Sequence, residues 1–360
     1  MSKIVSIGTA VPGYCHQQMD ILSFMQKVYA LNDVEARKLR FLYSQSGITQ
    51  RYSTIADYTR PVPEWKFYPQ TENLEPFPSL EQRMAVYHKQ APLLSVDAIR
   101  DCLNHIHQPK NITHLITVSC TGMSAPGLDL QVMELMDLEK TIFRTSINFM
   151  GCYAAIHALK IGDAICKSDN QAQVLIVCTE LCTLHFQREA TVDNMTSSLL
   201  FGDGAAAALL VHDNAKEEGL FIDAFYSEIN RKGKRDMAWE LSSSGFLMTL
   251  SGYVPDLIEE DFAAVTDRAL AKEGSSVSDV SHWCIHPGGK RILQAIHKSL
   301  GFTNGQLQCS YEVLNEFGNL SSASILFVLK KMMEQKQEVK KLFGAAFGPG
   351  LTVETFTAHR

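Results

Sequence analysis

Three residues in separate parts of the chain have side chains that together suit acyl-transfer chemistry. Cys152 lies in SINFMGCYAA, where an extended segment ends and an apolar helix begins, while His286 lies in CIHPGGKRIL and Asn319 in NEFGNLSSAS. The positive end of a helix favours a thiolate, and a neighbouring histidine would lower the thiol pKa further. Imidazole and amide N–H groups can both donate to a developing oxyanion. The set fits thioester capture and enolate stabilisation without a metal or redox cofactor.

Each of the three also has an ordinary structural interpretation. A cysteine in an apolar stretch is usually a small core residue. His286 before Pro-Gly-Gly could hold a turn, and Asn319 could cap a helix. The catalytic interpretation therefore depends on whether the fold brings the three together.

An internal repeat predicts that it does. NITHLITVSCTG is echoed by DVSHWCIHPGG, with His114 matching His282 at an offset of 282 − 114 = 168. NFMGC is echoed by NEFGN, with Cys152 matching Asn319 at an offset of 319 − 152 = 167. A third pair, FGDGAAAALLV and FGPGLTVETF, follows in the same order.

The repeat predicts two copies of one α/β unit. We expect an N-terminal half over 1–215 with the nucleophilic cysteine and a C-terminal half over 216–360 with the histidine and asparagine. Equivalent strand ends would face each other across a pseudo-two-fold axis, where α/β sheets place their ligands. Cys152 and Asn319 would then approach one another there.

Strands alternating with helices give the first half its pattern, which is typical of α/β layers. The segment over 60–78 breaks this alternation, because it contains five prolines, and it is expected to be a loop or lid. The expected elements are a strand near the N-terminus, a helix over 79–106, a strand over 114–120, a helix near 129–136, a strand over 142–149, a helix after 152, a strand over 172–180 and a turn into a strand over 199–211.

Composition narrows the function class. The chain has 360 residues and a net charge of −6 without a basic run, which argues against nucleic-acid binding. No segment approaches the roughly 18 to 20 apolar residues of a membrane span, and the N-terminus lacks a signal-peptide core. The nine cysteines have neither metal-ligand nor disulfide spacing, so we expect reduced thiols in a cytoplasmic protein.

Several long blocks resemble those of type III polyketide synthases, the chalcone synthase-like branch of the thiolase superfamily. The signature blocks are SINFMGCYAA, CIHPGGKRIL, NEFGNLSSASILFVL and GAAFGPGLTVET. FPSLEQRMAVYHKQAPLLSVDAI, QPKNITHLITVSCTG and LFGDGAAA extend the resemblance in order over nearly the whole chain. It implies a thiolase-like αβαβα sandwich of two pseudo-symmetric five-stranded halves, usually assembled as a homodimer.

The resemblance also implies a reaction. A starter acyl group moves from acyl-CoA to Cys152, malonyl-CoA loses CO₂, and the resulting carbanion attacks the thioester. His286 would pair with the thiolate during loading and then join Asn319 in stabilising the enolate. Phe201 matches an aromatic residue beside the family's cavity and would solvate the departing carboxylate poorly; otherwise it is an ordinary core aromatic. CoA thioesters enter as substrates, and no cofactor is implied.

Departures from the plant pattern affect the cavity. Met248 stands where the family often has a second gatekeeping phenylalanine, and Cys182 and His185 stand where plant members commonly have threonines. Ser321 keeps the serine found two residues after the family's asparagine. These differences make an alkylpyrone, an alkylresorcinol or a small phenolic product at least as plausible as a chalcone-like one.

CoA is strongly anionic, so an acidic protein needs local cations at the tunnel mouth. Lys38 resembles a family CoA contact, whereas Phe41 and Gln45 stand where plant members usually have further basic residues. Lys290 and Arg291 would compensate in part. Each of the three cations has an ordinary alternative as a solvated surface charge.

Three alternative functions are weighed against this one. A ketoacyl-ACP synthase III shares Cys, His and Asn but typically has an HQAN-like motif, where this chain has HPGGKRI. An HMG-CoA synthase needs an acid/base glutamate in the loop that reads SCTGMSAPG, which has no carboxylate. A non-catalytic acyl-CoA-binding protein on the same fold is disfavoured by the intact Cys152, His286 and Asn319.

Overall fold

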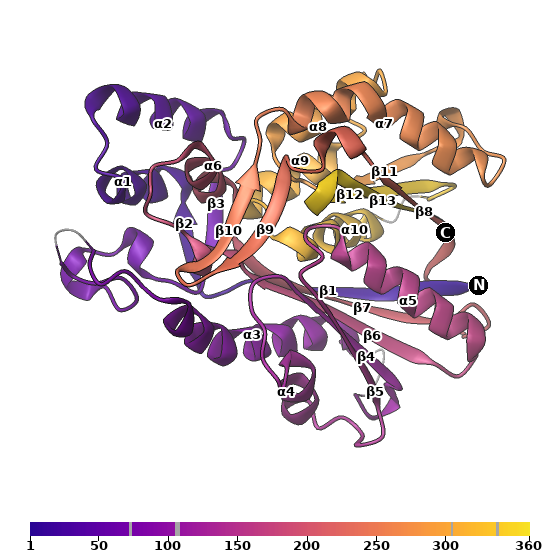
Figure 1. The fold of residues 1–360 in the computed structure, drawn as a ribbon. Helices are drawn as coiled ribbons and strands as arrows, with labels where there is room; N and C mark the ends of the chain where they lie inside the picture. Colours follow the sequence, from indigo (N-terminus) through magenta and orange to yellow (C-terminus); the bar gives the residue numbers. More distant parts are fainter. Residues whose placement is uncertain (72–73, 105–108, 304, 336–337) are drawn as a thin grey trace.

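The computed structural model describes residues 1–71, 74–104, 109–303, 305–335 and 338–360. Its centre is a nine-stranded mixed sheet with the order β11-β12-β13-β8-β1-β7-β6-β4-β5 (Figure 1). Five strands belong to the first half: β1 (Ser2–Ala10), β4 (His114–Ser119), β5 (Phe143–Asn148), β6 (Gln173–Leu181) and β7 (Asp203–His212). The second half contributes, within the described residues, β8 (Leu220–Ile229), β11 (His282–Ile285), β12 (Leu342–Gly348) and β13 (Thr352–His359).

The two halves repeat the same strand pairing. β4 runs parallel to β6, with His114 opposite Val174, and β11 runs parallel to β12, with His282 opposite Leu342. Both pairs are 60 residues apart, since 174 − 114 = 342 − 282 = 60. β6 then pairs antiparallel with β7, as β12 does with β13. The predicted pseudo-symmetry is confirmed, although four strands in the described part of the second half replace the five expected.

The halves are also joined more directly than expected. β1 pairs antiparallel with β8, with Ser2 opposite Ile222, so hydrogen bonds continue from one half to the other. The result is one sheet rather than two separate ones. Because the two halves share one hydrogen-bonded sheet, their relative position is fixed at the centre of the molecule, where the repeat predicts the candidate residues to meet.

Helices cover the outer faces of the sheet and also fill the space between its first-half strands and its second-half strands. This arrangement gives the αβαβα layers (Figure 1). One outer layer contains α3 (Leu80–Leu103) and α4 (Leu128–Leu135). The central layer contains α5 (Ala154–Ser168) and α10 (Ser324–Glu334). The other outer layer contains α7 (Val254–Ala271), α8 (Lys290–Ser299) and α9 (Gln308–Phe317). The predicted sandwich is therefore confirmed.

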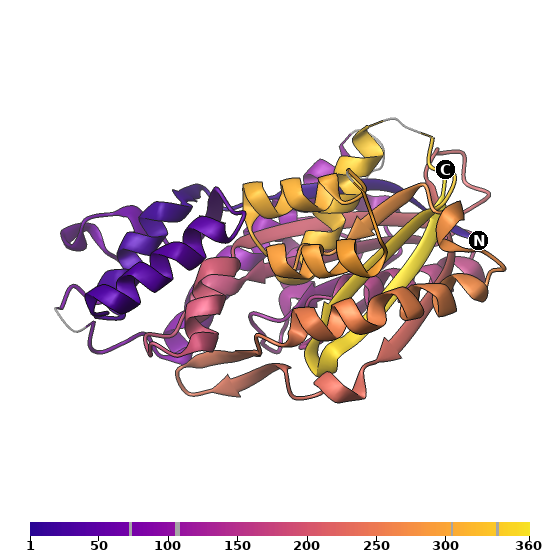
Figure 2. The same cartoon turned by 90° about the horizontal axis from the view of Figure 1, so that it is seen from above.

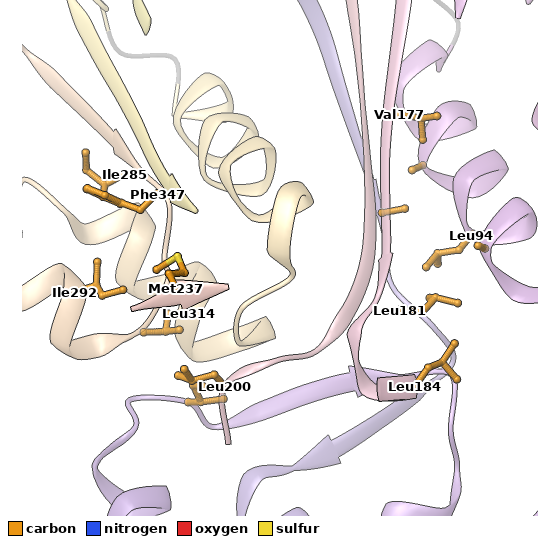
Figure 3. Packing of buried hydrophobic residues seen from close by; sticks show 14 of the residues in the cluster. Leu94, Val177, Leu181, Leu184, Leu200, Met237, Ile285, Ile292, Leu314 and Phe347 are labelled. Carbon is orange, nitrogen blue, oxygen red and sulfur yellow. The ribbon is translucent and has the colours of Figure 1, made fainter. Parts of the chain in front are cut away.

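Strand periodicity explains the layering. In β6, Val174 and Ile176 belong to the central core with α5 and α10, whereas Leu175 and Val177 belong to the outer core with α3. Successive side chains point to opposite faces, so a strand buried on both faces is apolar throughout. Figure 3 shows Val177 and Leu181 on the side of the strand that faces Leu94.

Most predicted elements are present, with two informative differences. α3 begins after Ser79, whose side chain forms a capping box with Gln82, and it ends at Leu103; part of the predicted span, 105–108, lies outside the described residues. The turn predicted to lead into a strand over 199–211 is present, with β7 beginning at Asp203, but α6 (Val192–Leu200), which comes directly before it, was not predicted.

The proline-rich segment over 60–78 is a packed loop in its described part. The Asp57 carboxylate accepts hydrogen bonds from the backbone N–H groups of Lys66, Phe67 and Tyr68. Trp65 and Tyr68 are buried against aromatic side chains, including Phe24. The prediction of an irregular segment is confirmed, and these contacts hold the segment against the rest of the protein. Residues 72–73 lie outside the described residues.

Additional elements gather at the end of the molecule opposite both termini (Figure 2). They are α1 (Gln18–Val28), α2 (Asp33–Gln45), the β2–β3 pair (Tyr14–Gln17 and Gln50–Ser53) and α6, with the hairpin of β9 (Met237–Ser242) and β10 (Gly245–Leu250) beside them. All of these segments except α2 contribute residues to the cavity described below. Nowhere in the described chain is a helix both long and apolar enough to cross a membrane.

Candidate active site

Cys152 lies in a sharp turn between β5 and α5. Phe149 and Gly151 have positive φ angles of 58° and 85°. A Cβ atom on Gly151 would lie 2.1 Å from Cδ of Pro349, which follows β12 in the second half. Only glycine therefore fits, and the turn holds the thiol at the start of α5, against the loop between β12 and β13 of the other half.

A chain of contacts joins the three candidate catalytic residues. The Cys152 thiol points to Ser321 Oγ at 3.7 Å, and the Ser321 N–H donates to Asn319 Oδ1 at 2.8 Å. Asn319 Nδ2 donates to the Gly288 carbonyl at 3.3 Å, and the Gly288 N–H donates to the His286 carbonyl at 2.9 Å. The fold thus brings Cys152 from one half beside Asn319 and the His286 loop from the other.

Phe201 belongs to the same junction. It forms an isolated parallel bridge with Asn319, in which the Asn319 N–H donates to Leu200 O at 2.8 Å and the Gly202 N–H donates to Asn319 O at 3.0 Å. Arg51 Nη1 donates to the Phe201 carbonyl at 2.6 Å. The backbone of Phe201 is consequently tied to that of Asn319.

The pKa values of Cys152 and His286 differ from those expected for a thiolate at neutral pH. Burial raises the pKa of Cys152 to about 12, hydrogen bonds from Ser321 and Asn319 oppose this, and the Glu180 carboxylate adds to it. Burial lowers the pKa of His286 to about 3, and its ring nitrogens have no hydrogen-bond partner among the described residues. The predicted lowering of the thiol pKa is wrong for this state, because desolvation outweighs the helix and histidine effects.

Glu180 is a buried carboxylate close to the nucleophile that the sequence analysis missed. It accepts hydrogen bonds from the Cys120 N–H and Thr121 Oγ1, both at 2.9 Å, and from Ser322 Oγ. Burial raises its pKa to about 7 despite these bonds. The available signal was a glutamate ending the apolar run AQVLIVCTE, since an acid is rarely buried without a reason.

A cavity with about 960 Å³ of space unoccupied by atoms, including its opening to solvent, adjoins the thiol. Six predicted site residues line it: Cys152, Phe201, Met248, Cys182, His185 and Ser321. Its walls also include residues that sequence reasoning missed, among them Arg51, Thr121, Trp239 and Phe246. Trp239 and Phe246 lie on the β9–β10 hairpin. In the sequence, only the position of Met248 indicated that this hairpin lines the cavity.

The remaining predicted residues lie elsewhere. His286 and Asn319 are not among the lining residues and are buried, with 2% and 3% of their surfaces exposed. Lys38 is exposed on α2, and Lys290 begins α8 with its side chain packed beside Gly47. Arg291 is exposed near Asp256, at 3.9 Å. In the described chain, no group of three or more His, Cys, Asp and Glu side chains is arranged to hold a metal ion.

Comparison with known protein families matches both halves. Residues 1–214 match the model described as "Chalcone and stilbene synthases, N-terminal domain", and residues 226–360 match the corresponding C-terminal domain. The chain is 30% identical over 362 residues to "Probable polyketide synthase 1" of Dictyostelium discoideum. That alignment covers 98% of this chain but only 11% of the relative.

Solved structures agree in fold over the full chain. A crystal structure of PKS-I from the brown alga Ectocarpus siliculosus has a TM-score of 0.94 at 26% identity, covering 100% of this chain and 98% of that one. The C-terminal type III polyketide synthase domain of Steely1, described as a type I/III hybrid from Dictyostelium, has a TM-score of 0.92 at 27% identity, covering 100% and 99%. The chain therefore belongs to the chalcone and stilbene synthase family, the type III polyketide synthases.

Proposed function

We propose that this chain transfers a starter acyl group from acyl-CoA to Cys152, extends it with malonyl-CoA and releases a cyclised polyketide. The observation that carries the proposal is the contact chain from Cys152 through Ser321 and Asn319 to the His286 loop, beside a cavity lined mainly by apolar side chains. Cysteine supplies a nucleophile, and imidazole and amide supply the donors that a thioester reaction needs.

Loading begins from a neutral thiol and a neutral imidazole. The thiol proton passes to His286 as sulfur attacks the acyl-CoA carbonyl, the tetrahedral intermediate collapses, and the proton passes to the departing CoA thiolate. Because burial disfavours both charged groups, the ion pair forms only as substrate arrives and excludes water. Acyl-enzyme and free CoA are the products of this step.

Extension uses the same oxygen-binding groups. Malonyl-CoA loses CO₂, and the electron pair of the broken C–C bond forms an enolate that His286 and Asn319 stabilise through N–H donors. Phe201 offers no hydrogen bond to the carboxylate, which favours its departure as CO₂. The enolate carbon then attacks the Cys152 thioester, forming the new C–C bond and releasing the thiolate, which is reprotonated.

The cavity favours apolar starters. Ile21 and Met25 of α1 and Phe186 line one part of it, and Met237 and Met248 contribute adaptable walls. Cys182 and His185 stand where plant members commonly have threonines, and Ser321 lies beside the thiol. We therefore propose an alkylpyrone, alkylresorcinol or related phenolic product.

Product analysis is the decisive experiment. Purified protein is incubated with labelled malonyl-CoA and a panel of aliphatic and aromatic acyl-CoA starters, and products are identified by mass spectrometry. Pyrones or resorcinols support the proposal and reveal starter length. One condensation only, or activity restricted to malonyl-carrier protein, would favour a ketoacyl synthase III-like enzyme, while no turnover with bound acyl-CoA would favour a binding protein.

Two variants test the assigned roles. Cys152→Ala should abolish covalent loading, because it removes the nucleophile, whereas Cys166→Ala in the central core should still load on Cys152. Acylation of another cysteine in the first variant would refute the assignment. Asn319→Ala should reduce CO₂ release by about 10²-fold or more and loading much less; equal losses would contradict separate roles.

Lys38, Lys290 and Arg291 are proposed as CoA contacts. Lys290 packs beside Gly47 at the end of α2, which brings the start of α8 close to the helix that carries Lys38. Lys38→Ala and Lys290→Ala should each raise KM for acyl-CoA several-fold with little change in kcat, since phosphate contacts are retained throughout the reaction. Unchanged KM in both would remove these residues from the CoA site.

We also propose a cytoplasmic homodimer. β5 is an edge strand with most of its residues exposed, and Phe143 on it is 70% exposed. Such edges are normally covered or paired. All nine cysteines are free, as expected in a reducing compartment. Sedimentation should give a dimer, and Phe143→Lys should shift it towards monomer; a stable, active wild-type monomer would contradict the proposal.

A further inference from the structure

Both ring nitrogens of His185 have fixed hydrogen-bond partners. Nε2 lies 2.7 Å from the Thr121 carbonyl oxygen, and Nδ1 lies 3.1 Å from the backbone nitrogen of Phe246. A carbonyl only accepts, so Nε2 carries the proton. An amide N–H only donates, so Nδ1 offers its lone pair. The contacts are compatible only with the neutral ring in the Nε2–H tautomer.

The His185 ring also packs against the β9–β10 hairpin. It is stacked on Phe246, with ring centroids 4.1 Å apart and an interplanar angle of 8°. Trp239 meets it edge-on at 5.8 Å and donates from Nε1 to the Cys120 carbonyl at 2.7 Å. His185 and Trp239 therefore attach the hairpin to the adjacent residues Cys120 and Thr121.

This attachment reaches the turn that holds the nucleophile. Phe246 contacts Phe149 edge-to-face, with centroids 4.9 Å apart, and Phe149 is a residue of that turn. Cys120 Sγ accepts the Gly151 N–H at 3.0 Å. The hairpin, the wall residue His185 and the turn before Cys152 consequently form one packed unit.

We infer that His185 is a positioning residue, which holds the β9–β10 hairpin against the Thr121 wall and so limits the width of the cavity during chain extension. This inference rests on the proposed polyketide function. Trp239, Phe246 and Met248 all line the cavity from this hairpin. Because both nitrogens are engaged by the protein, His185 offers the substrate its ring and acts neither as a general acid nor as a general base.

The protonation state supports this role. Burial lowers the pKa of His185 to about 3, the hydrogen bond to Thr121 O opposes the shift, and the Arg83 guanidinium on α3 adds to it. A proton on Nδ1 would face the Phe246 N–H, so two donors would meet. The ring therefore stays neutral across the pH range in which the protein would work, and the attachment is retained.

Variants at position 185 test the inference through product length. His185→Phe keeps an aromatic ring but removes both hydrogen bonds, and His185→Gln keeps polar groups but removes the stacked ring. For each variant, the ratio of products is compared at equal amounts of acylated Cys152, and we expect about a fivefold rise in the ratio of products with one extra malonyl unit. His297→Phe, which loses a carbonyl contact to Thr303 outside this cavity, is the matched control and should keep the wild-type ratio.

A spectroscopic measurement on the wild-type protein is independent of turnover. With ¹⁵N-labelled histidine, the signal lost in His185→Phe should show an Nε2–H tautomer and should not titrate between pH 5 and 8. A titrating ring, or a folded His185→Phe protein with loading and product ratio both unchanged, would overturn the inference. A wild-type protein that forms no polyketide would instead refute the proposed function.

Discussion

At residue scale, the backbone conformation of Gly151 determines the position of the Cys152 thiol. Its φ angle is positive, and a Cβ atom would overlap Pro349 from the other half. Gly151→Ala should therefore lower the free energy of unfolding by about 3 kcal/mol and slow loading of Cys152. Gly252, which has no atom within 4 Å of an added Cβ, is the control, and Gly252→Ala should stay within about 0.5 kcal/mol. Equal urea-unfolding curves for the two variants would contradict this account.

Glu180 makes a separate prediction about pH. Its pKa is raised by burial from the usual 4.5 to about 7, so the folded state binds the proton more tightly than the unfolded state. Stability from this group is present below pH 4.5 and is lost as the pH rises towards 7. Relative to Glu180→Gln, the wild type should lose about 2 kcal/mol of unfolding free energy between pH 5 and 8. Urea unfolding at both values measures this, and parallel pH dependence would contradict it.

At the scale of elements, one buried carboxylate links the central helix to the second half. Glu354 on β13 lies 2.9 Å from Lys160 Nζ and 3.2 Å from His157 Nε2, both on α5, and accepts a hydrogen bond from Ser227 of β8. Burial would raise its pKa, but the hydrogen bonds from His157, Ser227 and Lys160 prevail and lower it. Its stabilisation is therefore present at neutral pH and is lost as the pH falls through the folded-state pKa.

Glu354→Gln should reduce the free energy of unfolding by about 2 kcal/mol at pH 7, because the Lys160 ammonium loses its partner. In a Lys160→Met background the same change should cost less, since no cation is then left without a carboxylate. A double-mutant cycle in urea measures the difference. Additive losses would show that the pair does not couple α5 to β13.

At the scale of the whole molecule, the continuous sheet and the shared central core predict cooperative unfolding. The central core draws residues from both halves, including Ile176 of β6 and Ala346 of β12. Hydrogen exchange should therefore give similar opening free energies for peptides that cover β6 and β12. Glu354→Gln should lower both together. Exchange of β12 well before β6 would instead show that the halves open independently.

The layers and the candidate catalytic set could be predicted from the sequence, because both follow from local patterns. Apolar runs such as HLITVSC predicted β4. The matching offsets predicted that Cys152 and Asn319 approach each other, and the structure joins them through Ser321, although Asn319 follows helix α9 and not a strand. Periodicity along one strand is enough to predict which faces are buried. α6 could not be predicted this way, because VDNMTSSLL has only a short apolar end, which leads directly into the turn before β7.

The pKa values at the site and the shape of the cavity could not be predicted from the sequence, because both depend on how distant segments pack together. A helix start and a nearby histidine predicted a low thiol pKa, yet burial by segments distant in sequence raises the pKa of Cys152 and lowers that of His286. Desolvation depends on everything packed around a group, which spacing along the chain does not encode. For the same reason, the tautomer of His185 can be assigned only from its contacts with Thr121 and Phe246, which lie in two other segments. The buried position of Glu180 likewise depends on Ser322, from a third segment.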